Sequence, residues 1–511
     1  MEINLKFIIR YFSYSIMGVY LICLLLIFIY SLTQLNMLRY FLRFEKKKEK
    51  NLVIMPPLPT ELPNVTIQLP LYNELYVVER LLECISKIEY PKNKLQIQVL
   101  DDSTDESLAL TESLVLKHQK NNIPIEHITR IDRNGFKAGA LKYGLESAKG
   151  DFIAIFDADF LPQTDWLLKT IPHFQNPEIG VVQTRWGHLN RNYSVLTEIQ
   201  AFALDAHFLL EQVGRNQQNH FINFNGTAGI WRKECIFDAG NWEGDTLTED
   251  LDLSYRAQLK QWKFHYLDEV ITPAELPVSL SAIRSQQFRW NKGGAENFRK
   301  MIGRVVRSKK ISLSTKFNAL FHLLNSSMFL NVLLVAVLSV PLLFIKAYYP
   351  NLRILFNLSG LFILSTLIFF SCYWFIHKRI YDGGINSFLE YIKRFLLFYS
   401  LVMGFALHNS IAVIEGYLGK KSPFVRTPKF NIKKDSNSIS TNKYSLKNTT
   451  IYTFIELLFA LYFLFGMVSA FWVSAEGDFG LFPFHLLLFI GFSSITYHGL
   501  KKNSLNDGKE K

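Results

Sequence analysis

Two aspartates close a short apolar run in the sequence FDADF, residues 156–160. Asp157 and Asp159 stand two positions apart, and side chains at this spacing in a strand share a face, so both carboxylates can approach one hard cation. Carboxylate oxygens suit Mg²⁺ or Mn²⁺, and such a cation would hold a diphosphate. An Asp-rich turn between a strand and a helix, with capping or solvated carboxylates, explains the same residues without a metal.

A second acidic group ends another β-rich run, VLDDSTDES, residues 99–107. Asp101 or Asp102 is placed to accept a hydrogen bond from a nucleotide base or ribose. Asp and Ser also favour turns and helix N-caps, so Thr104 or Asp105 would then simply cap the next helix. The residues alone support the two interpretations equally.

The run RNGFKAGAL, residues 133–141, places Lys137 just after a glycine-containing loop and at the predicted start of a helix. Free backbone amides and a cation at a helix N-terminus suit a phosphate group. The alternative is an ordinary exposed lysine on a helix.

The run GDTLTEDLDLSYRAQ, residues 244–258, carries Glu249, Asp250 and Asp252 at the predicted N-terminus of a helix. Capping and the helix dipole already account for acidic residues there. Transfer of a sugar to a hydroxyl group also needs a carboxylate that removes the acceptor proton. Asp250 is the candidate for this base.

The stretch SQQFRWNKGGAENFRKM, residues 285–301, combines cations, amides and an indole close to a long apolar segment. In a helix, Gln286, Arg289 and Trp290 share one face. Trp offers a flat apolar surface to a sugar ring, and Arg can donate two hydrogen bonds to diphosphate oxygens. An interfacial belt of Trp and Arg beside lipid is the alternative, and it leaves Gln286 unexplained.

The elements that must position these residues form an α/β pattern between residue 64 and about residue 300. Short β-rich runs alternate there with helical patterns, which predicts a doubly wound, largely parallel sheet. Ligands bind such sheets at the carboxyl ends of the strands, where the aspartates fall. The runs are VTIQLPLY (65–72), LQIQVLDDS (95–103), IPIEHITR (123–130) and DFIAIFDAD (151–159).

Composition narrows the classes of protein that fit. The chain has 511 residues, 49% of them hydrophobic, and a net charge of +12. This charge suits anionic lipid surfaces or phosphate-bearing ligands. Lys and Arg cluster beside apolar segments rather than in a basic domain, which argues against nucleic-acid binding. The four cysteines form no CxxC pair, so neither a disulfide framework nor a zinc site is indicated.

Apolar segments long enough to cross a membrane flank the α/β region. Lys and Arg are denser after the first segment than before it, so we expect the N-terminus outside and residues from about 39 onward in the cytosol. Residues 386–417 include Lys393, Arg394 and Glu415, and are predicted to form an interfacial or re-entrant helix. The five predicted spans are 14–32, 322–346, 354–376, 452–473 and 482–500.

Seven motifs together resemble those of the family 2 glycosyltransferases. The similarity is closest to the cellulose synthase superfamily, especially its plant-type mannan and glucomannan synthase-like branch. It runs in order over residues 60 to 305, and the flanking apolar segments fit it. The motifs are LPLYNE, VLDDSTD, FKAGAL, FDADF, FNGTAGIWR, TLTEDLDL and QQFRW.

The resemblance implies a nucleotide-sugar-binding GT-A domain that uses Mg²⁺ or Mn²⁺. The implied nucleotide-sugar contacts are Tyr72, Glu74, Asp101, Asp102, Lys137 and Asp157. The implied metal site is formed by Asp159 and Asp157, with Asp159 preferred as the direct ligand. The implied catalytic group is Asp250 as base, with Glu249, Gln286, Arg289 and Trp290. In FVRTPK, residues 424–429, Thr427 and Lys429 resemble part of a gating loop, although the motif spacing departs from the family pattern.

These assignments divide the chain into six expected regions. The regions are an N-terminal membrane helix (1–38), a basic and Pro-rich linker (39–63), the GT-A domain (64–305), two membrane helices (306–380), an interfacial helix with a basic gating-like loop (381–450), and two membrane helices with a short tail (451–511).

The expected activity is that of an inverting, processive transferase. It would extend a β-linked polysaccharide, a β-1,4-mannan, glucomannan or glucan, from a GDP- or UDP-sugar and pass the glycan outward. A transferase that adds one sugar to a lipid acceptor is the alternative enzyme, and a non-catalytic membrane scaffold is the alternative of another class. We expect a multi-pass protein of the plasma or inner membrane, if bacterial, with lipid as a partner and accessory subunits left open.

Overall fold

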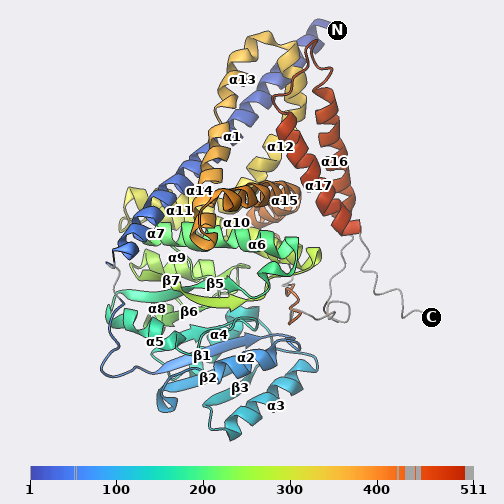
Figure 1. The fold of residues 1–511 in the computed structure, drawn as a ribbon. Helices are drawn as coiled ribbons and strands as arrows, with labels where there is room; N and C mark the ends of the chain where they lie inside the picture. The colour runs from blue at the N-terminus through green and yellow to red at the C-terminus, as the bar shows by residue number, and fades with distance from the viewer. Residues whose placement is uncertain are drawn as a thin grey trace, which may run out of the picture.

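A mixed β-sheet forms the centre of the α/β part, below a group of long helices (Figure 1). The protein's structure is a computed structural model that describes residues 2–50, 52, 55–422, 425–431, 444 and 451–500. Within these residues the sheet has seven strands in the order β3-β2-β1-β4-β6-β5-β7. They are β1 (Val65–Leu71), β2 (Leu95–Asp101), β3 (Ile125–Thr129), β4 (Phe152–Ile155), β5 (Ile179–His188), β6 (Gly229–Arg232) and β7 (Lys263–Ala274).

The strand directions confirm the expected α/β sheet and refine it. The pairs β1–β2, β1–β4 and β2–β3 are parallel, and β5 also runs parallel to β7. Strand β6 is antiparallel to both β4 and β5, so the sheet is mixed rather than wholly parallel. The first four strands correspond to the four β-rich runs of the sequence, and their carboxyl ends meet at one edge.

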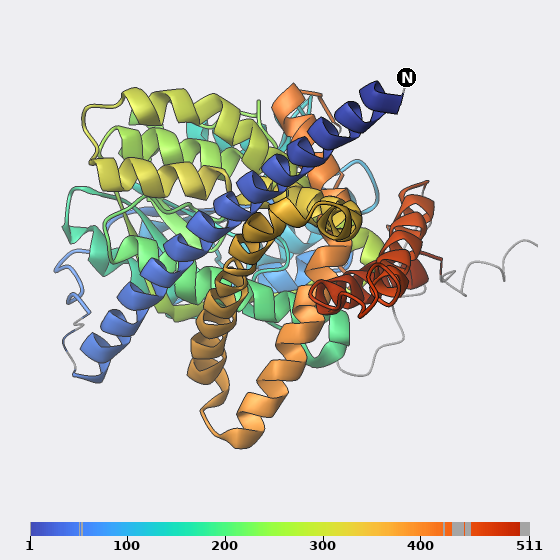
Figure 2. The same ribbon diagram turned by 90° about the horizontal axis from the view of Figure 1, so that it is seen from above.

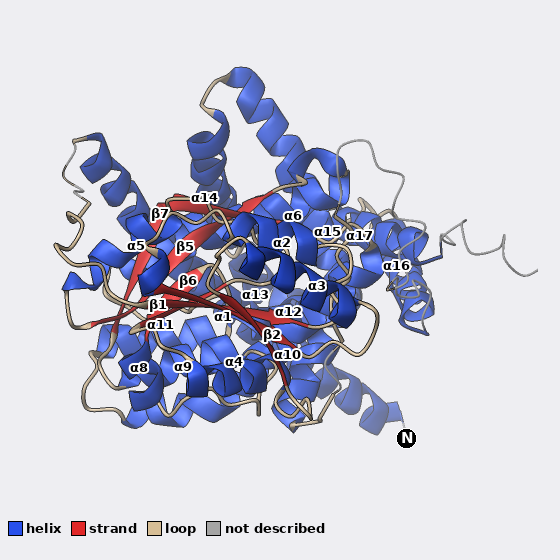
Figure 3. Ribbon diagram, turned by 90° about the horizontal axis from the view of Figure 1, so that it is seen from below, coloured by secondary structure: helices blue, strands red, loops and turns tan. Residues whose placement is uncertain are grey.

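Helices cover both faces of this sheet (Figure 3). One hydrophobic core joins the sheet to α2 (Val78–Ile85), α3 (Ser107–Lys120) and α5 (Trp166–Thr170). The other core joins it to α4 (Phe136–Ser147), α8 (Lys233–Asp238) and α9 (Glu249–Leu259). Alternate strand residues therefore serve different cores: Ile153 lies in one and Ala154 in the other.

The remaining helices lie between the sheet and the long apolar helices, or belong to them. Those nearest the sheet are α6 (Val195–Asp205), the π-helical segment η4 (Ala206–Gln212), α7 (Val213–Asn216), α10 (Leu280–Arg307) and α11 (Leu313–Leu323). The others are α1 (Glu2–Glu49), α12 (Met328–Tyr348), α13 (Arg353–Gly360), α14 (Ile363–Tyr381), α15 (Ile385–Leu418), α16 (Ile451–Ser469) and α17 (Phe482–Leu500).

Five helical stretches within the described residues are long and apolar enough to cross a membrane: Ile9–Glu49, Asn325–Tyr348, Ile354–Tyr381, Ile385–Leu418 and Ile451–Ser469. Four of them match predicted spans. The predicted span 482–500 is not in this set, because α17 carries His485, His498 and several small polar residues that lower its hydropathy. Helix α15 meets the same criterion instead.

Helix α15 lies across the bases of the other apolar helices rather than along them (Figure 1). Seen from above, α15 (orange) extends in the plane of the view, while α16 and α17 (red) are foreshortened (Figure 2). It packs against α10, α12 and α17. This orientation fits the predicted interfacial helix. The interfacial position of α15 stays a prediction, and so do the boundaries of the six regions expected from the sequence.

One buried ion pair ties the α/β part to the apolar helices. Arg284 of α10 donates to the Glu456 carboxylate of α16, and the two residues are 6% and 0% exposed. The backbone carbonyl of Arg284 also bonds to His408 Nε2 at 3.0 Å. The start of α10, which carries the QxxRW residues, is therefore fixed to α16 and α15.

Replacing Glu456 by Leu leaves the Arg284 guanidinium buried without its counter-charge. A broken buried pair costs about 3–5 kcal/mol, so we expect a clear drop in the thermal unfolding midpoint of the purified protein. The double variant Arg284→Met, Glu456→Leu removes both charges and should recover most of the loss. A single variant as stable as the wild type would show that the pair does not hold these helices together.

Candidate active site

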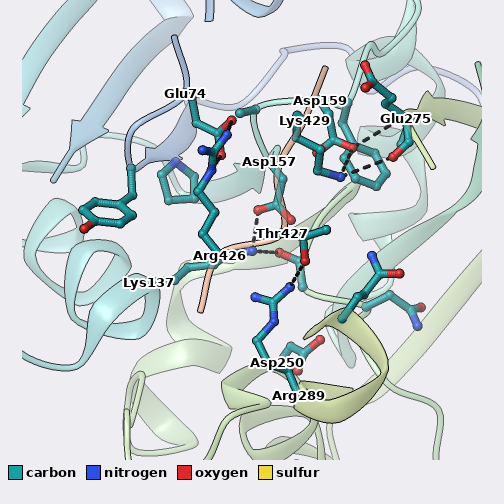
Figure 4. Close-up of a pocket in the computed structure, with 18 of the residues that line it drawn as sticks. Glu74, Lys137, Asp157, Asp159, Asp250, Glu275, Arg289, Arg426, Thr427 and Lys429 are labelled. Carbon is teal, nitrogen blue, oxygen red and sulfur yellow. Dashed lines mark hydrogen bonds and ion pairs between the residues drawn. The ribbon is translucent and has the colours of Figure 1, made fainter. Parts of the chain in front are cut away.

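One pocket opens at the carboxyl ends of the parallel strands, next to Arg289 of α10 (Figure 4). Elements far apart in the sequence contribute to it: the strand ends, the start of α9, one face of α10 and the segment 425–431. Every predicted site residue except one lines this pocket: Tyr72, Glu74, Asp102, Lys137, Asp157, Asp159, Glu249, Asp250, Gln286, Arg289, Trp290, Thr427 and Lys429.

Asp101 is the exception, because it does not line the pocket. It is 2% exposed at the end of β2, where its carboxylate accepts the backbone N–H of Ser103 at 2.9 Å and contacts His127 Nε2 at 3.1 Å. These contacts fix the β2 turn against β3. The geometry gives no support to the predicted contact between Asp101 and a nucleoside.

Asp102 does face the pocket, but its carboxylate is already bound by a residue that the sequence analysis did not identify. Arg130 donates from Nε to Oδ1 at 2.8 Å and from Nη2 to Oδ2 at 2.5 Å. The guanidinium carbon of Arg133 lies 3.2 Å from the centroid of the Tyr72 ring. This wall of the pocket thus combines the Asp102 carboxylate, the Arg133 guanidinium and an aromatic face, with Arg130 bound to the carboxylate. The sequence signal for both arginines was the cluster of cations just before Lys137.

The two aspartates of FDADF follow β4, which ends at Ile155, so they lie in the loop rather than on the strand. Lys137 Nζ donates to Asp157 Oδ1 at 2.5 Å and to the carbonyl oxygen of Gly226 at 2.8 Å. Lys429 Nζ donates to Asp159 Oδ2 at 2.6 Å. Each aspartate is therefore balanced by one ammonium group.

Gly226 explains why the FNGTAG motif belongs to this site. Its φ of +78° lies in the left-handed region, which glycine adopts without strain. A Cβ at this position would lie 3.1 Å from Asp250 Oδ2 and 3.6 Å from Lys137 Nζ. The absence of a side chain lets the backbone approach both charged groups closely.

Asp250 and Glu249 stand at the first turn of α9, which begins at Glu249. Burial raises the pKa of Asp250, and the neighbouring charge of Glu249 adds to this, to about 7. The backbone N–H of Leu251 at 2.8 Å and the Lys137 charge oppose the shift. Burial also raises the pKa of Glu249. A carboxyl group with a pKa near neutrality can exchange a proton under ordinary conditions.

Helix α10 presents Gln286, Arg289 and Trp290 to the pocket, as the helical spacing predicted. Arg289 Nη2 donates to Thr427 Oγ1 at 2.6 Å. Burial lowers the pKa of Arg289, while Asp157 and Glu249 oppose that shift. The helix approaches the α9 turn closely, because a Cβ on Gly293 would lie 2.5 Å from Thr248 Oγ1.

The charge environment of Lys137 links these groups. Burial alone would lower the pKa of Lys137, but the charges of Asp157, Glu249 and Asp250 raise it overall. The ammonium group therefore stays charged between the two acidic clusters. Such a fixed cation suits a ligand that brings negative charge into the pocket.

The segment 425–431 crosses the pocket and engages residues of the α/β part. Arg426 donates to Glu74 from Nε at 2.7 Å and from Nη2 at 2.5 Å. Thr427 and Lys429 lie in the pocket as predicted, whereas Phe424 lies outside the described residues. Glu74 was predicted to contact the nucleoside, but both of its carboxylate oxygens accept hydrogen bonds from Arg426. Neither Arg426 nor Glu275, which also lines the pocket, was predicted.

A second acidic cluster, Glu243, Asp245 and Asp252, has the spacing of metal ligands but does not line the pocket. Lys300 Nζ lies 2.7 Å, 2.7 Å and 2.9 Å from these three carboxylates. Arg256 also pairs with Asp252 at 2.7 Å, so Lys300 and Arg256 together offset most of the charge of the cluster, and Lys300 joins α10 to the α9 region.

Comparison with known proteins finds relatives of the α/β part. Residues 63–293 match the family model described as Glycosyltransferase like family 2. The chain is 43% identical over 264 residues to "Probable glucomannan 4-beta-mannosyltransferase 4" of Oryza sativa subsp. japonica, a match that covers 51% of this chain and 48% of the relative. It is 42% identical over 264 residues to "Glucomannan 4-beta-mannosyltransferase 7" of Arabidopsis thaliana, with 51% and 48% covered.

A longer match covers 392 residues of "Probable glucomannan 4-beta-mannosyltransferase 6" of Oryza sativa subsp. japonica at 34% identity, or 75% of this chain and 65% of the relative. The chain spans about half the length of the first relatives it matches. Among solved structures, a mannosyltransferase of Pyrobaculum calidifontis in complex with GDP-Man and Mn²⁺ aligns with a TM-score of 0.52 and 17% identity, covering 80% of this chain and 100% of that one. This likeness confirms the predicted GT-A type of α/β fold.

Proposed function

We propose, from the premise that residues 63–293 form a glycosyltransferase family 2 domain, that the protein transfers hexosyl residues from a nucleotide-sugar to a growing β-linked polysaccharide. The observation that carries this proposal is the convergence of Asp159, Asp250 and Trp290 in one pocket. A β-1,4-mannan or glucomannan is the product we favour, because the relatives are named glucomannan 4-beta-mannosyltransferases. A β-glucan is the third candidate.

The oxygen atoms around Asp159 fit a divalent cation. The carboxylates of Asp157 and Asp159 and the carbonyl oxygen of Glu275 are hard ligands of the kind that Mg²⁺ and Mn²⁺ prefer. Ammonium groups already lie within hydrogen-bonding distance of all three groups, so this part of the pocket accommodates positive charge. We assign Asp159, together with Asp157, to the metal. When bound, the cation would neutralise negative charge on the leaving diphosphate.

The transfer itself needs one proton acceptor and several charge-balancing groups. The acceptor hydroxyl oxygen attacks the anomeric carbon while the bond from that carbon to the diphosphate oxygen breaks. Asp250 takes the hydroxyl proton, and the nucleoside diphosphate leaves. Lys137 and Arg289 balance the charge that this group carries. A single displacement inverts the anomeric configuration, so an α-linked donor yields a β-linked product.

The wall formed by Tyr72 and Asp102 is the proposed place for the nucleoside. Tyr72 offers an aromatic face, and Asp102 is held in position by Arg130. Either a GDP-sugar or a UDP-sugar could be the donor, and a panel of donors distinguishes the two.

The membrane setting fits an acceptor that reaches the pocket beside the apolar helices. Helix α10 carries Gln286, Arg289 and Trp290 and is fixed to α16 by the Arg284–Glu456 pair, so the acceptor side of the pocket lies beside the apolar helices. We propose that the catalytic domain is cytosolic, that the protein crosses the membrane several times, and that the glycan leaves along these helices.

The test is a donor panel with purified protein in lipid. GDP-mannose, GDP-glucose, UDP-glucose and UDP-N-acetylglucosamine are supplied with Mn²⁺, and nucleotide release, product size and linkage are measured. We expect turnover with a hexosyl donor and a long β-linked product. A product with one added residue would favour transfer to a lipid acceptor, and no turnover with any donor would favour the scaffold.

Trp290→Ala should raise the acceptor KM more than it weakens donor affinity, because the indole projects from α10 and not from the strand ends that carry Tyr72 and Asp102. Loss of a stacking surface of this kind corresponds to about a tenfold rise in the acceptor KM, or about 1.4 kcal/mol. Separate titrations of donor and acceptor measure the two effects. Trp262→Ala, outside the pocket, is the control; a larger effect on donor than on acceptor would contradict the assignment.

A further inference from the structure

Lys429 and Asp159 form an ion pair at the proposed metal site. Lys429 Nζ lies 2.6 Å from Asp159 Oδ2, and the two side chains are 13% and 5% exposed. The same ammonium group donates to the carbonyl oxygen of Glu275 at 3.3 Å. A cationic group of the protein thus already occupies oxygen ligands that suit Mg²⁺ or Mn²⁺.

The chain around Lys429 holds that ammonium group in place. Arg426 is bound by both oxygens of Glu74, and Thr427 accepts from Arg289 (Figure 4). The backbone N–H of Phe430 donates to Glu275 Oε1 at 2.7 Å. Thr427 and Phe430 are each 4% exposed. Segment 425–431 is therefore docked in the pocket over residues that donor and metal would contact.

A divalent cation and an ammonium group repel each other strongly when both lie within bonding distance of one carboxylate oxygen. We propose that the two exchange at Asp159. In the donor-free protein, Lys429 neutralises Asp159 and holds segment 425–431 across the pocket. A cation that entered would take over Asp159, and Lys429 and its segment would then be released from that carboxylate. The identity of the metal site in this inference rests on the proposed function.

The exchange predicts how Mn²⁺ alone binds to the full-length protein without any donor. Lys429→Met removes the competing ammonium group. If the lysine-bound state outnumbers the free state by about ten to one, the variant binds Mn²⁺ about tenfold more tightly. Free Mn²⁺ is measured by electron paramagnetic resonance during a titration of the protein in lipid nanodiscs.

Two further variants make the titration specific. Lys420→Met changes an exposed lysine that pairs with Glu415 outside the pocket, and it should bind Mn²⁺ like the wild type. Asp159→Asn should lose the site. Arg426→Met leaves Lys429 and Asp159 intact but frees the segment from Glu74, so we expect a smaller gain in Mn²⁺ affinity; it supplies the same test if Lys429→Met does not fold.

The inference is overturned if Lys429→Met and Arg426→Met bind Mn²⁺ no more tightly than the wild type while Asp159→Asn loses binding. That result would place the metal at Asp159 without competition. Failure of the proposed function has another signature, namely no turnover with any donor whatever the Mn²⁺ affinities. The two outcomes are therefore read from separate measurements.

Discussion

Asp250→Asn is expected to abolish transfer while leaving donor affinity close to that of the wild type. Asn keeps the size of the side chain and can still accept the Leu251 N–H, but it cannot take the acceptor proton. Loss of a general base lowers turnover by about 10²–10⁴-fold. Nucleotide release measures turnover, and calorimetric titration with the donor measures affinity.

The matched control for Asp250→Asn is Asp245→Asn. Asp245 lies just before the same helix, is exposed, and pairs with Lys300 outside the pocket, so its change should leave turnover within about twofold of the wild type, as for ordinary surface substitutions. Wild-type turnover in Asp250→Asn would end the assignment of the base.

The pH profile gives Asp250 a second signature. Its pKa is raised to about 7 by burial and by Glu249, and only the ionised form accepts a proton. Because the carboxyl group protonates as the pH falls through that value, kcat/KM should fall about tenfold per pH unit below it, and level off above it. The residual activity of Asp250→Asn should not show this fall at low pH.

Asp159→Asn is the second large effect, and it should remove metal binding and transfer together. The amide offers one neutral oxygen in place of a carboxylate, so the cation loses its most buried anionic ligand. Loss of the charge stabilisation that the cation supplies lowers turnover by about 10²–10³-fold. Unlike Asp250→Asn, this variant should also lower the affinity for the donor, because the diphosphate loses its counter-ion.

Asp165→Asn is the control for Asp159→Asn. Asp165 lies six residues along the chain, is more exposed, and pairs with Lys169 on α5. Its replacement should change neither Mn²⁺ binding nor turnover. If Asp159→Asn bound Mn²⁺ like the wild type, the metal would have to lie elsewhere.

The sequence predicted those parts of the site whose signal is local. Asp157 and Asp159 end a strand-forming run, Glu249 and Asp250 begin a helix, and the i, i+3, i+4 spacing placed Gln286, Arg289 and Trp290 on one face. In each case the type of element decides which way the side chains point. The parallel strand order then brings the strand ends to one edge, and all of these residues line the pocket.

Such local patterns could not predict contacts between distant parts of the chain. Nothing near Glu74 shows that Arg426, about 350 residues away, takes both of its oxygens. Asp101 and Asp102 are adjacent in the sequence, but only tertiary packing places His127 against the first and Arg130 against the second. Likewise, the charged residues within 386–417 predicted an interfacial helix, and only the structure shows that α15 is long and apolar enough to cross a membrane and yet lies across the bases of the other apolar helices.

The central claim is that one pocket binds the donor and performs the transfer. A cryo-electron microscopy structure of the protein in nanodiscs, with a non-transferable nucleotide-sugar analogue and Mn²⁺, tests it most directly. We predict the diphosphate between Lys137 and Arg289, the metal on Asp159, and the sugar facing Asp250 and Trp290. Nucleotide density bound elsewhere on the domain, with this pocket unchanged, would contradict the account.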